Sequence, residues 1–335
     1  MRGDGMKRLT ALLLAAALAL SLAACGPEGK AADTVRYGLS NAWDALMPYN
    51  SPSGSNYSRI IYDKIYDRLA YVHADGTLEP RAASSWESAD GGTAALFHLD
   101  EKAAFHDGTP VTAKNYLYYT MVFSTLVASE AEGKDRQAGL TIVGFEEFNA
   151  YDGTNEGDGV SKTFTGLRLL ADNQFSVTVK ADYANYYYAI SYAGFTPFVK
   201  ELWCGDFDIA DDGEGCYFTD GFYNKTGDSF DMAAHLVASS NNTDTTYACS
   251  GPYVVESYDE ADKSAILTLN PNFPGNYEGA KPSIAKVIYK KVVSATQLDD
   301  LKSGGVDVLM GITGGAETDE AVAACDNSNG AFVYT

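Results

Sequence analysis

The chain has 335 residues, of which 46% are hydrophobic and 21% charged, and its formal net charge is -21 at pH 7. This composition is typical of a globular protein with a substantial core, and it excludes an intrinsically disordered chain. An acidic balance of this size argues against nucleic-acid binding, which needs basic patches, so we expect no nucleic-acid partner.

Residues 1–24 have the layout of a secretory signal peptide. Lys7 and Arg8 precede an apolar run over residues 9–20 that consists almost wholly of Ala and Leu. The run is shorter than the roughly 20 apolar residues that span a bilayer. The ending Leu22-Ala23-Ala24-Cys25 resembles a bacterial lipobox, in which Cys25 would take a diacylglyceryl group and become the mature N-terminus. The alternative is an ordinary signal peptide with an incidental Cys.

The expected lipid on Cys25 would anchor the protein to the extracytoplasmic face of the cell membrane.

Residues 25–33 are then a short polar linker. A strand is predicted over 34–40, and Ile61, Ile65 and Leu69 share one helical face, which predicts a helix over 56–69. Four further elements are predicted in this half: a strand over 94–99, a helix over 113–128 capped by Thr112, a hairpin over 164–180 and a helix over 184–192.

Residues 129–160 are rich in glycine and acidic residues, and we expect an irregular surface segment there. The second half of the chain predicts a helix over 229–238, a hairpin over 253–269, a strand over 286–293, a helix over 294–302, a strand over 305–310, a helix over 315–324 and a strand from 331. Ser294 and Gln297 have the spacing of a capping box for the helix over 294–302.

Four cysteines remain beyond Cys25, namely Cys204, Cys216, Cys249 and Cys325. Export permits disulfides, and Cys204 and Cys216, which close a short acidic loop, are the candidate pair. Four cysteines allow three pairings, and the sequence does not choose among them. No C-x-x-C pair occurs, so a zinc or redox site is not expected.

The acidic residues between Cys204 and Cys216 could bind Ca²⁺, which favours clustered oxygen ligands. Their spacing departs from the EF-hand loop, since Ala210 stands where the third position from Asp208 needs an oxygen. We therefore expect a solvated acidic loop closed by the disulfide. No metal and no cofactor are predicted.

Catalytic chemistry has little support in the sequence. His106 and Asp107 could suggest a catalytic dyad, but the side chains of adjacent residues on a turn point apart. The following residues, Gly108-Thr109-Pro110, are typical of a turn. No G-x-S-x-G, H-E-x-x-H or P-loop motif occurs. We expect no catalytic residues and no enzyme. Tyr186-Tyr187-Tyr188 could line a cleft, although packing explains most of the 23 tyrosines.

Four blocks resemble the extracytoplasmic solute-binding proteins, family 5, of peptide and nickel ABC importers. The blocks are residues 62–87, residues 97–115 with the His106-Asp107-Gly108 turn, residues 250–273 beginning Ser250-Gly251-Pro252-Tyr253, and residues 287–308. The family pattern usually has an acidic residue where Asn115 stands, which predicts a weaker helix cap there.

The resemblance implies an α/β, periplasmic-binding-protein-like two-lobe fold of type II, in the family 5 variant with an extra side domain. Carried over, the first lobe takes residues 34–56 and 165–270, and the side domain takes 57–164. Residues 271–335 form a partial second lobe. Family members are much longer, so we expect an incomplete second lobe in a truncated or incomplete sequence.

The resemblance also implies a lipid-anchored binding protein that delivers oligopeptides or another small solute to ABC permease subunits. In the family's peptide binders, the loop before the first helix pairs with the peptide as an added strand. The matching residues here are Asn50, Ser51, Pro52 and Asn56. Two alternatives remain open: an orphan surface lipoprotein that acts as a peptide sensor or adhesin, and a non-functional fragment.

Overall fold

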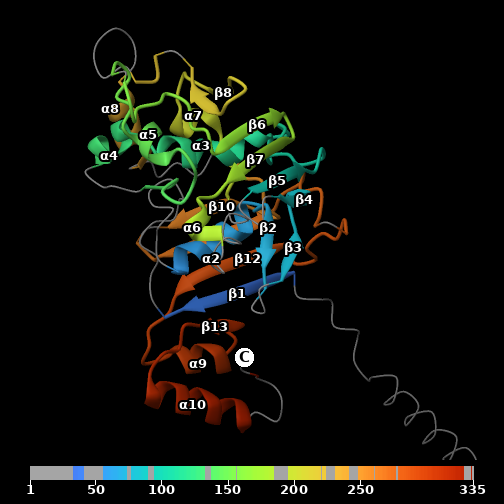
Figure 1. Cartoon of the computed structure of the whole chain (residues 1–335). Coiled ribbons are helices and arrows are strands. Elements are labelled where there is room, and N and C mark those ends of the chain that lie inside the picture. Colours follow the sequence, from blue (N-terminus) through green and yellow to red (C-terminus); the bar gives the residue numbers. More distant parts are fainter. Residues whose placement is uncertain are drawn as a thin grey trace, which may run out of the picture.

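The computed structural model describes residues 33–40, 56–73, 77–89, 94–132, 137–155, 157–184, 195–219, 221–223, 231–240, 248–259, 261–276, 278–327 and 333. Its centre is a five-stranded sheet with the order β10-β11-β12-β1-β13. The strands are β1 (Thr34–Leu39), β10 (Tyr253–Asp259), β11 (Ser264–Leu269), β12 (Lys286–Lys291) and β13 (Val308–Met310). Figure 1 shows this sheet between a larger upper part and a smaller lower part of the molecule.

The first described strand, β1, lies between two strands from the C-terminal part of the chain. β1 pairs in parallel with β12, with Thr34 opposite Lys286, and in parallel with β13 on its other side. Tyr37 and Tyr289 stack at 5.0 Å between ring centroids across the first of these pairs. The five-stranded sheet therefore continues across residue 270, where the sequence predicts the boundary between the first lobe and a second lobe starting at 271.

A second sheet has the order β4-β5-β7-β6 and is antiparallel throughout. Its strands are β4 (Ala83–Ala89), β5 (Ala94–Leu99), β6 (Leu167–Ala171) and β7 (Gln174–Thr178). The predicted strand over 94–99 and the predicted hairpin are confirmed. This sheet continues across the boundary predicted at 164/165, because β5, expected in the side domain, is hydrogen-bonded to β7, expected in the first lobe.

Two short hairpins and several helices complete the fold. The hairpins are β2 (Ala70–Val72) with β3 (Leu78–Pro80), and β8 (Ile209–Asp211) with β9 (Cys216–Phe218). The helices are α2 (Asn56–Ile65), α3 (Ala113–Val122), α4 (Leu126–Glu132), α5 (Phe145–Asn149), α6 (Ala181–Ala184), α7 (Lys200–Trp203), α8 (Met232–Ser240), α9 (Gln297–Lys302) and α10 (Gly315–Asp326).

The helix predicted over 113–128 is interrupted after Val122. The Ser124 hydroxyl donates to the Thr120 carbonyl at 2.6 Å, and the Thr125 hydroxyl donates to the Val122 carbonyl at 2.7 Å. Hydroxyl groups that bond carbonyls of the preceding turn compete with the helical ladder and bend a helix. α4 therefore starts anew at Leu126.

Residues 129–160 differ from the irregular surface segment that the sequence predicts. Ile142, Phe145 and Phe148, three residues apart, are at most 4% exposed, and Phe148 stacks on Phe164 at 4.8 Å. Ile142, just before α5, and Phe145 and Phe148 on α5 insert into the core, although glycines and acidic residues surround them in the sequence.

Two further local predictions are corrected. Ser294 does not cap α9: the N-cap is Thr296, because the Thr296 N–H closes a turn on the Val293 carbonyl at 2.9 Å before the helix begins. Cys204 and Cys216 are buried free cysteines and form no disulfide. The β8–β9 hairpin closes the acidic loop instead, with Asp211 opposite Cys216. The strand predicted from 331 and most of the helix predicted over 184–192 lie outside the described residues.

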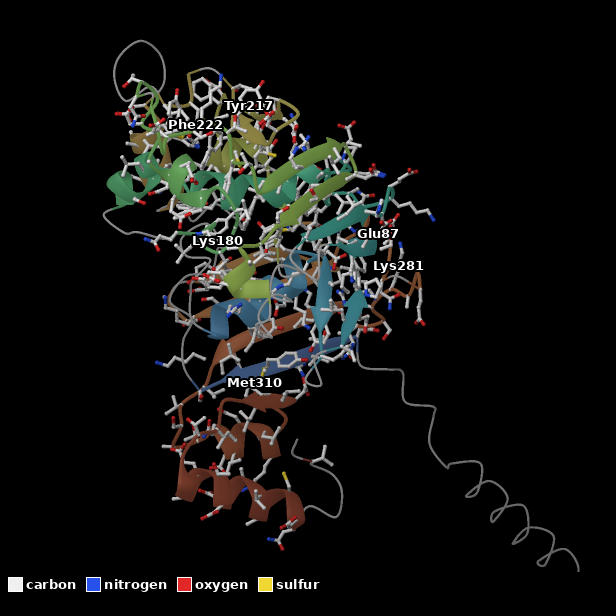
Figure 2. The ribbon with its side chains drawn as sticks, in the orientation of Figure 1. Glu87, Lys180, Tyr217, Phe222, Lys281 and Met310 are labelled. Atoms are coloured by element: carbon white, nitrogen blue, oxygen red, sulfur yellow. The ribbon has the colours of Figure 1, made fainter. Side chains whose placement is uncertain are left out.

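The buried core is continuous through the upper part of the molecule and reaches the five-stranded sheet. Its largest fully buried side chain is Trp203, which meets Phe123 edge to face at 5.0 Å. Figure 2 places Phe222 and Tyr217 in the upper part, and Met310 at the junction with the lower part that holds α9 and α10. No helix in the described ranges is both long and apolar enough to cross a bilayer.

Candidate functional site

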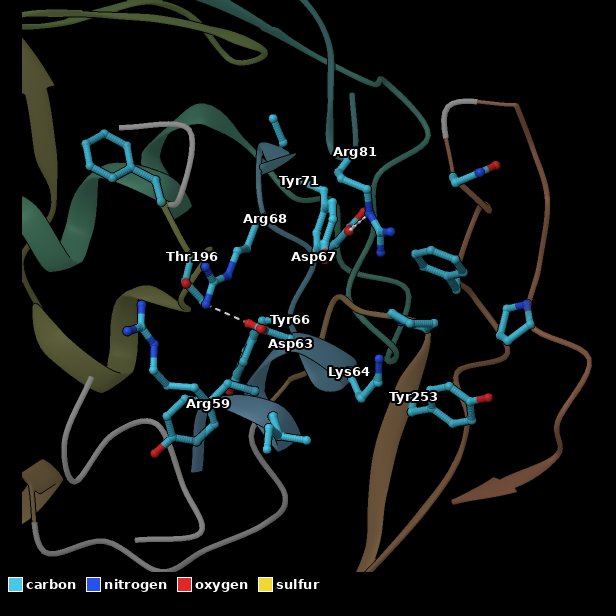
Figure 3. Close-up of a pocket in the computed structure, with 18 of the residues that line it drawn as sticks. Arg59, Asp63, Lys64, Tyr66, Asp67, Arg68, Tyr71, Arg81, Thr196 and Tyr253 are labelled. Atoms are coloured by element: carbon cyan, nitrogen blue, oxygen red, sulfur yellow. Dashed lines mark hydrogen bonds and ion pairs between the residues drawn. The ribbon is translucent and has the colours of Figure 1, made fainter. Parts of the chain in front are cut away.

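A pocket of about 1180 Å³ lies beside α2, where the five-stranded sheet meets the upper part of the molecule. Val35 and Tyr37 of β1 contribute to its wall, and Arg59 to Lys64 of α2 form another part (Figure 3). The described lining includes seven tyrosines, namely Tyr37, Tyr62, Tyr66, Tyr71, Tyr116, Tyr119 and Tyr253. It contains no His, Cys or Ser among the residues that the structure describes.

α2 is amphipathic, and this decides which of its side chains reach the pocket. Ile61 and Ile65 are fully buried against the core, as the sequence pattern predicts, and Leu69 beyond the helix is buried as well. Arg59, on the opposite side of the helix, is exposed, and Lys64 is half-buried. The helical period thus places apolar residues in the core and cationic residues at the pocket.

Two ion pairs are formed between residues that line the pocket. Arg68 binds Asp63 at 2.6 Å between nitrogen and oxygen, and Arg81 binds Asp67 at 3.1 Å. The first pair is exposed to solvent at both side chains, whereas the Asp67 side chain is only 8% exposed. Exposed pairs contribute little to stability, so Asp63–Arg68 serves mainly to hold the two side chains in place.

Asp67 occupies an unusual position for a carboxylate. Burial raises its pKa from 3.8 to about 6, although the neighbouring Arg81 guanidinium acts in the opposite direction. Its backbone is held from two sides, because its N–H donates to the Ser250 hydroxyl at 3.0 Å and its carbonyl accepts from the Tyr116 hydroxyl at 3.1 Å.

We expect the raised pKa of Asp67 to make the protein less stable as pH rises from about 4 to about 6. In that window the folded state keeps a proton that the unfolded chain has lost, so the free energy of unfolding falls with pH. The change is on the order of 3 kcal/mol, at about 1.4 kcal/mol for each pKa unit. Urea unfolding of wild type and Asp67→Asn at pH 4 and 7 measures it.

Asp67→Asn is the control because it keeps the shape of the side chain and does not titrate. The stability of wild type relative to this variant should fall between pH 4 and pH 7. A relative stability that instead rises with pH would mean that Arg81 dominates over burial, and would contradict the prediction.

The block Ser250-Gly251-Pro252-Tyr253 clamps the end of α2. The Gly251 N–H donates to the Ile65 carbonyl at 2.8 Å, and the Gly251 carbonyl accepts from the Asn270 side chain at 2.8 Å. A β-carbon on Gly251 would lie 2.6 Å from the Lys64 carbonyl oxygen. Only glycine allows this approach, so the block positions Lys64 and Tyr253 on the pocket wall.

The predicted turn at His106 is confirmed, and it is structural. The Thr109 N–H donates to the Asp107 side chain at 2.9 Å, and Gly108 has φ +90. His106 Nδ1 accepts the Cys249 N–H at 3.0 Å, so the imidazole ties this turn to the segment before Gly251. His106 and Asp107 face different partners and form no dyad.

Asn115 strengthens the cap that the sequence predicts it to weaken. Its Oδ1 accepts a hydrogen bond from the Thr112 N–H at 2.7 Å. Its Nδ2 donates a buried hydrogen bond to the Phe198 carbonyl oxygen at 2.8 Å. A carboxylate at this position could accept the first bond but could not donate the second. The amide therefore links α3 to the segment that carries Phe198 into the pocket.

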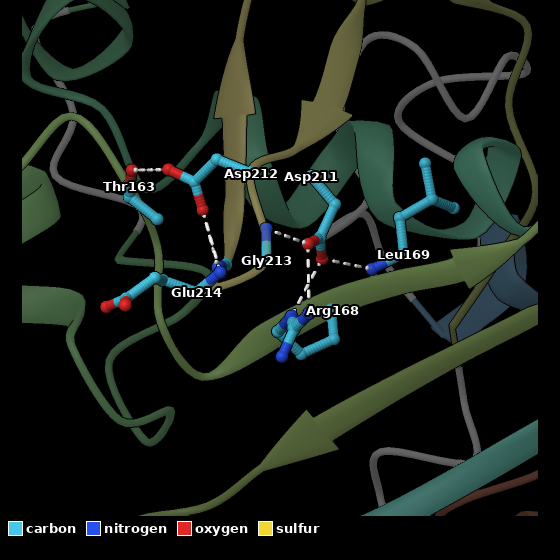
Figure 4. A network of polar contacts seen from close by, with 8 residues as sticks. Thr163, Arg168, Leu169, Asp211, Asp212, Gly213 and Glu214 are labelled. Carbon is cyan, nitrogen blue, oxygen red and sulfur yellow. Dashed lines mark hydrogen bonds and ion pairs between the residues drawn. The ribbon is translucent and has the colours of Figure 1, made fainter.

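The acidic loop between Cys204 and Cys216 is a set of separate, partnered carboxylates (Figure 4). Asp208 forms an ion pair with Lys114 at 2.9 Å. Asp211 accepts hydrogen bonds from two guanidinium nitrogens of Arg168, Nε at 2.8 Å and Nη2 at 3.0 Å. Asp212 accepts from the Thr163 hydroxyl at 2.8 Å. In the ranges that the structure describes, no group of three or more His, Cys, Asp or Glu could hold a metal ion.

Most of the residues predicted to bind lipid or ligand lie outside the described residues: Cys25, Asn50, Ser51, Pro52 and the Tyr186-Tyr187-Tyr188 run. Asn56 is the first residue of α2, one turn before Arg59. The predicted ligand loop therefore leads directly into a helix that lines the pocket.

Sequence reasoning missed the cations of the pocket, namely Arg59, Lys64, Arg68 and Arg81. They lie within a short stretch of a chain that carries 24 Lys and Arg against 45 Asp and Glu. The stretch from 59 to 81 is charge-balanced, with four basic and four acidic residues, whereas the whole chain is strongly acidic; this local balance was the available signal.

The family model described as "Bacterial extracellular solute-binding proteins, family 5 Middle" matches residues 77–325, more than half of the chain. The periplasmic oligopeptide-binding protein OppA of Salmonella typhimurium is 22% identical over 303 residues, which are 90% of this chain and 47% of that protein. The chain therefore spans about half the length of this relative.

Solved structures give the same result. OppA of Haemophilus influenzae in complex with RPPGFSPFR superposes with a TM-score of 0.59 at 14% identity, over 90% of this chain and 50% of that one. OppA of Burkholderia pseudomallei gives a TM-score of 0.58 at 17% identity, over 88% and 49%. These similarities show that the mixed α/β chain has the two-lobe binding-protein fold and covers about half of it.

Proposed function

Because the chain belongs to the bacterial extracellular solute-binding proteins of family 5, we propose that it captures peptides outside the cytoplasm and delivers them to an ABC importer. The main support for this proposal is the pocket beside α2. Ligand sites are concave, mostly apolar and furnished with a few polar groups, in volumes of about 300–1,000 Å³. At about 1180 Å³ the pocket exceeds this range, which suits an extended ligand.

The lining of the pocket also supports a peptide. Tyrosine rings offer flat apolar surface and a polar tip, which suits side chains of varied chemistry. The relatives named above include an oligopeptide-binding protein and a structure with a bound nonapeptide sequence. The described lining holds no His, Cys or Ser, and the role we propose is binding without catalysis.

We expect the purified chain to bind short peptides saturably, with a one-to-one stoichiometry, in isothermal titration calorimetry against a tetrapeptide library. Tyr71 lines the pocket and is 53% exposed, so Tyr71→Ala removes contact area without opening the core. We expect it to weaken binding about tenfold, or roughly 1.4 kcal/mol.

Leu170 is the matched control for Tyr71, because it is 47% exposed and lies on β6, outside the pocket lining. Leu170→Ala should bind as wild type does. Absence of binding to every peptide in the library would overturn the proposed function, and equal losses in both variants would show that the pocket is not the site.

We further propose that Cys25 carries a diacylglyceryl anchor. Two acyl chains on one residue are enough for stable membrane attachment, where a single chain is marginal. Wild type should then sediment with membranes, and Cys25→Ala should appear in the soluble fraction or remain unprocessed. Mass spectrometry of the N-terminus identifies the lipid. Wild type found wholly in the medium with an unmodified N-terminus would contradict this proposal.

A further inference from the structure

The pocket beside α2 has the opposite charge balance from the rest of the chain. Its described lining holds four cations and two carboxylates, an excess of two positive charges, in a chain of net charge -21: Arg59, Lys64, Arg68 and Arg81 against Asp63 and Asp67. A concave site lined with charges of one sign concentrates the field and draws in ligands of the other sign.

The two carboxylates are already engaged. Asp63 binds Arg68 at 2.6 Å and Asp67 binds Arg81 at 3.1 Å. The side chains of Arg59 and Lys64 have no ion-pair or hydrogen-bond partner in the described ranges of the chain. Arg59 is exposed, so its guanidinium is available to a ligand without the loss of an existing partner.

Arg59 and Arg68 lie on the same side of the pocket. Arg59 and Asp63 are four residues apart on α2, so their side chains are neighbours on one helix face, and Asp63 is the partner of Arg68. Figure 3 shows the ends of Arg59 and Arg68 turned toward the same region, with Thr196 beside them. Arg68 is thus held by Asp63, and Arg59 and Thr196 belong to the same pocket lining.

We propose that Arg59, with Arg68 and Thr196 beside it, forms an anion subsite that receives a carboxylate of the bound ligand. The planar guanidinium group matches a carboxylate with two parallel N–H···O bonds. Asp63 would keep Arg68 oriented, and Arg59 would supply the uncompensated charge. This inference rests on the proposed function for the peptide, but the subsite itself requires only a carboxylate.

The carboxylate could come from the C-terminus of a peptide or from an acidic side chain, and three matched probes separate the sources. They are an alanine tetrapeptide with a free C-terminus, its C-terminal amide, and the amide with one internal glutamate. Calorimetry with the purified full chain compares wild type, Arg59→Ala, Arg59→Lys and Lys302→Ala. Lys302 is exposed on α9, outside the pocket lining, and its loss changes net charge equally.

We expect wild type to bind at least one carboxylate-bearing probe about tenfold more tightly than the plain amide, and Arg59→Ala to abolish the difference. Arg59→Lys should keep part of it, and Lys302→Ala should keep all of it. The probe that retains the preference identifies the source of the carboxylate. Equal binding of all three probes by wild type, or an unchanged preference in Arg59→Ala, would overturn the subsite.

Thermal unfolding with succinate separates failure of the subsite from failure of the peptide proposal. Succinate at matched ionic strength should raise the melting temperature of wild type and leave that of Arg59→Ala unchanged. If no peptide binds while succinate still stabilises through Arg59, the subsite stands and the peptide function is wrong. If no peptide binds and succinate does not stabilise through Arg59, both are overturned; if peptides bind and neither response depends on Arg59, only the subsite is overturned.

Discussion

Gly251→Ala is expected to destabilise the protein by about 3 kcal/mol or more, at the upper end of what overpacking costs. The added β-carbon would lie 2.6 Å from the Lys64 carbonyl oxygen, 2.7 Å from the Ile65 carbonyl carbon and 2.8 Å from the Tyr66 nitrogen. All three are backbone atoms, which cannot rotate away as a side chain can.

The helix end cannot retreat from Gly251 either. Ile65 is fully buried and Tyr66 is 2% exposed, so a shift of this backbone would disturb the core beneath it. The same shift would break the Gly251 N–H bond to the Ile65 carbonyl. Tyr253 and Lys64 would move with it, so any variant that still folds should also bind ligand more weakly.

Urea unfolding at pH 7 measures the effect of Gly251→Ala, and Gly315→Ala is the matched control. Gly315 begins α10, and nothing lies within 4 Å of a β-carbon there, so alanine should cost nothing and should favour the helix slightly. If the free energy of unfolding of Gly251→Ala lies within about 1 kcal/mol of the wild-type value, a margin on the order of RT, the prediction that Gly251 must approach the end of α2 closely is wrong.

Asp211→Ala is expected to cost about 3 kcal/mol, because it breaks a largely buried ion pair and leaves its partners unpaired. The Asp211 side chain is 10% exposed, and besides Arg168 it accepts the Leu169 N–H at 2.9 Å and the Gly213 N–H at 2.8 Å. These bonds join β8 to β6, so they hold the β8–β9 hairpin against the four-stranded sheet (Figure 4).

The pH dependence of Asp211 runs opposite to that of Asp67. Burial alone would raise the pKa of Asp211, but the Arg168 guanidinium and the Gly213 and Leu169 N–H groups outweigh it and hold the pKa below its ordinary range. The stabilisation is therefore complete above about pH 4, the pKa of an unfolded aspartate, and is lost as pH falls through the lower folded value.

Asp212→Ala is the control for Asp211→Ala, and both are compared with wild type by urea unfolding at pH 7. Asp212 accepts the Thr163 hydroxyl and the Glu214 N–H but binds no cation among the described residues. Because Asp212 is exposed to solvent, its loss should cost only about 1 kcal/mol. Equal losses in the two variants would show that the Arg168 pair adds nothing.

Local structure was predictable wherever one short pattern sufficed. Apolar spacing at Ile61 and Ile65 predicted α2 and its buried face, and the Ala171-Asp172-Asn173 turn predicted the β6–β7 hairpin. The His106 turn followed from the glycine beside it. In these places neighbouring residues decide the backbone conformation, so sequence alone determined the element.

Predictions failed where distant residues decide. The amide of Asn115 is valuable because Phe198, far along the chain, presents a carbonyl to it. The loop between Cys204 and Cys216 is held by Arg168, which binds Asp211 from another sheet. The pairings of β5 with β7 and of β11 with β12, which cross the boundaries predicted at 164/165 and 270/271, could not be predicted, because a strand's own sequence does not identify its partner.

The sequence by itself determined the family resemblance, the elements with strong periodicity and the absence of a recognisable catalytic motif, since all of these depend on residues close together in the chain. Only the tertiary structure decided the pocket. Its walls come from β1, α2, the segment around Phe198 and the segment after Gly251. Whether Arg59 is a solvated surface residue or part of a binding site depends on which of these segments folding brings opposite it.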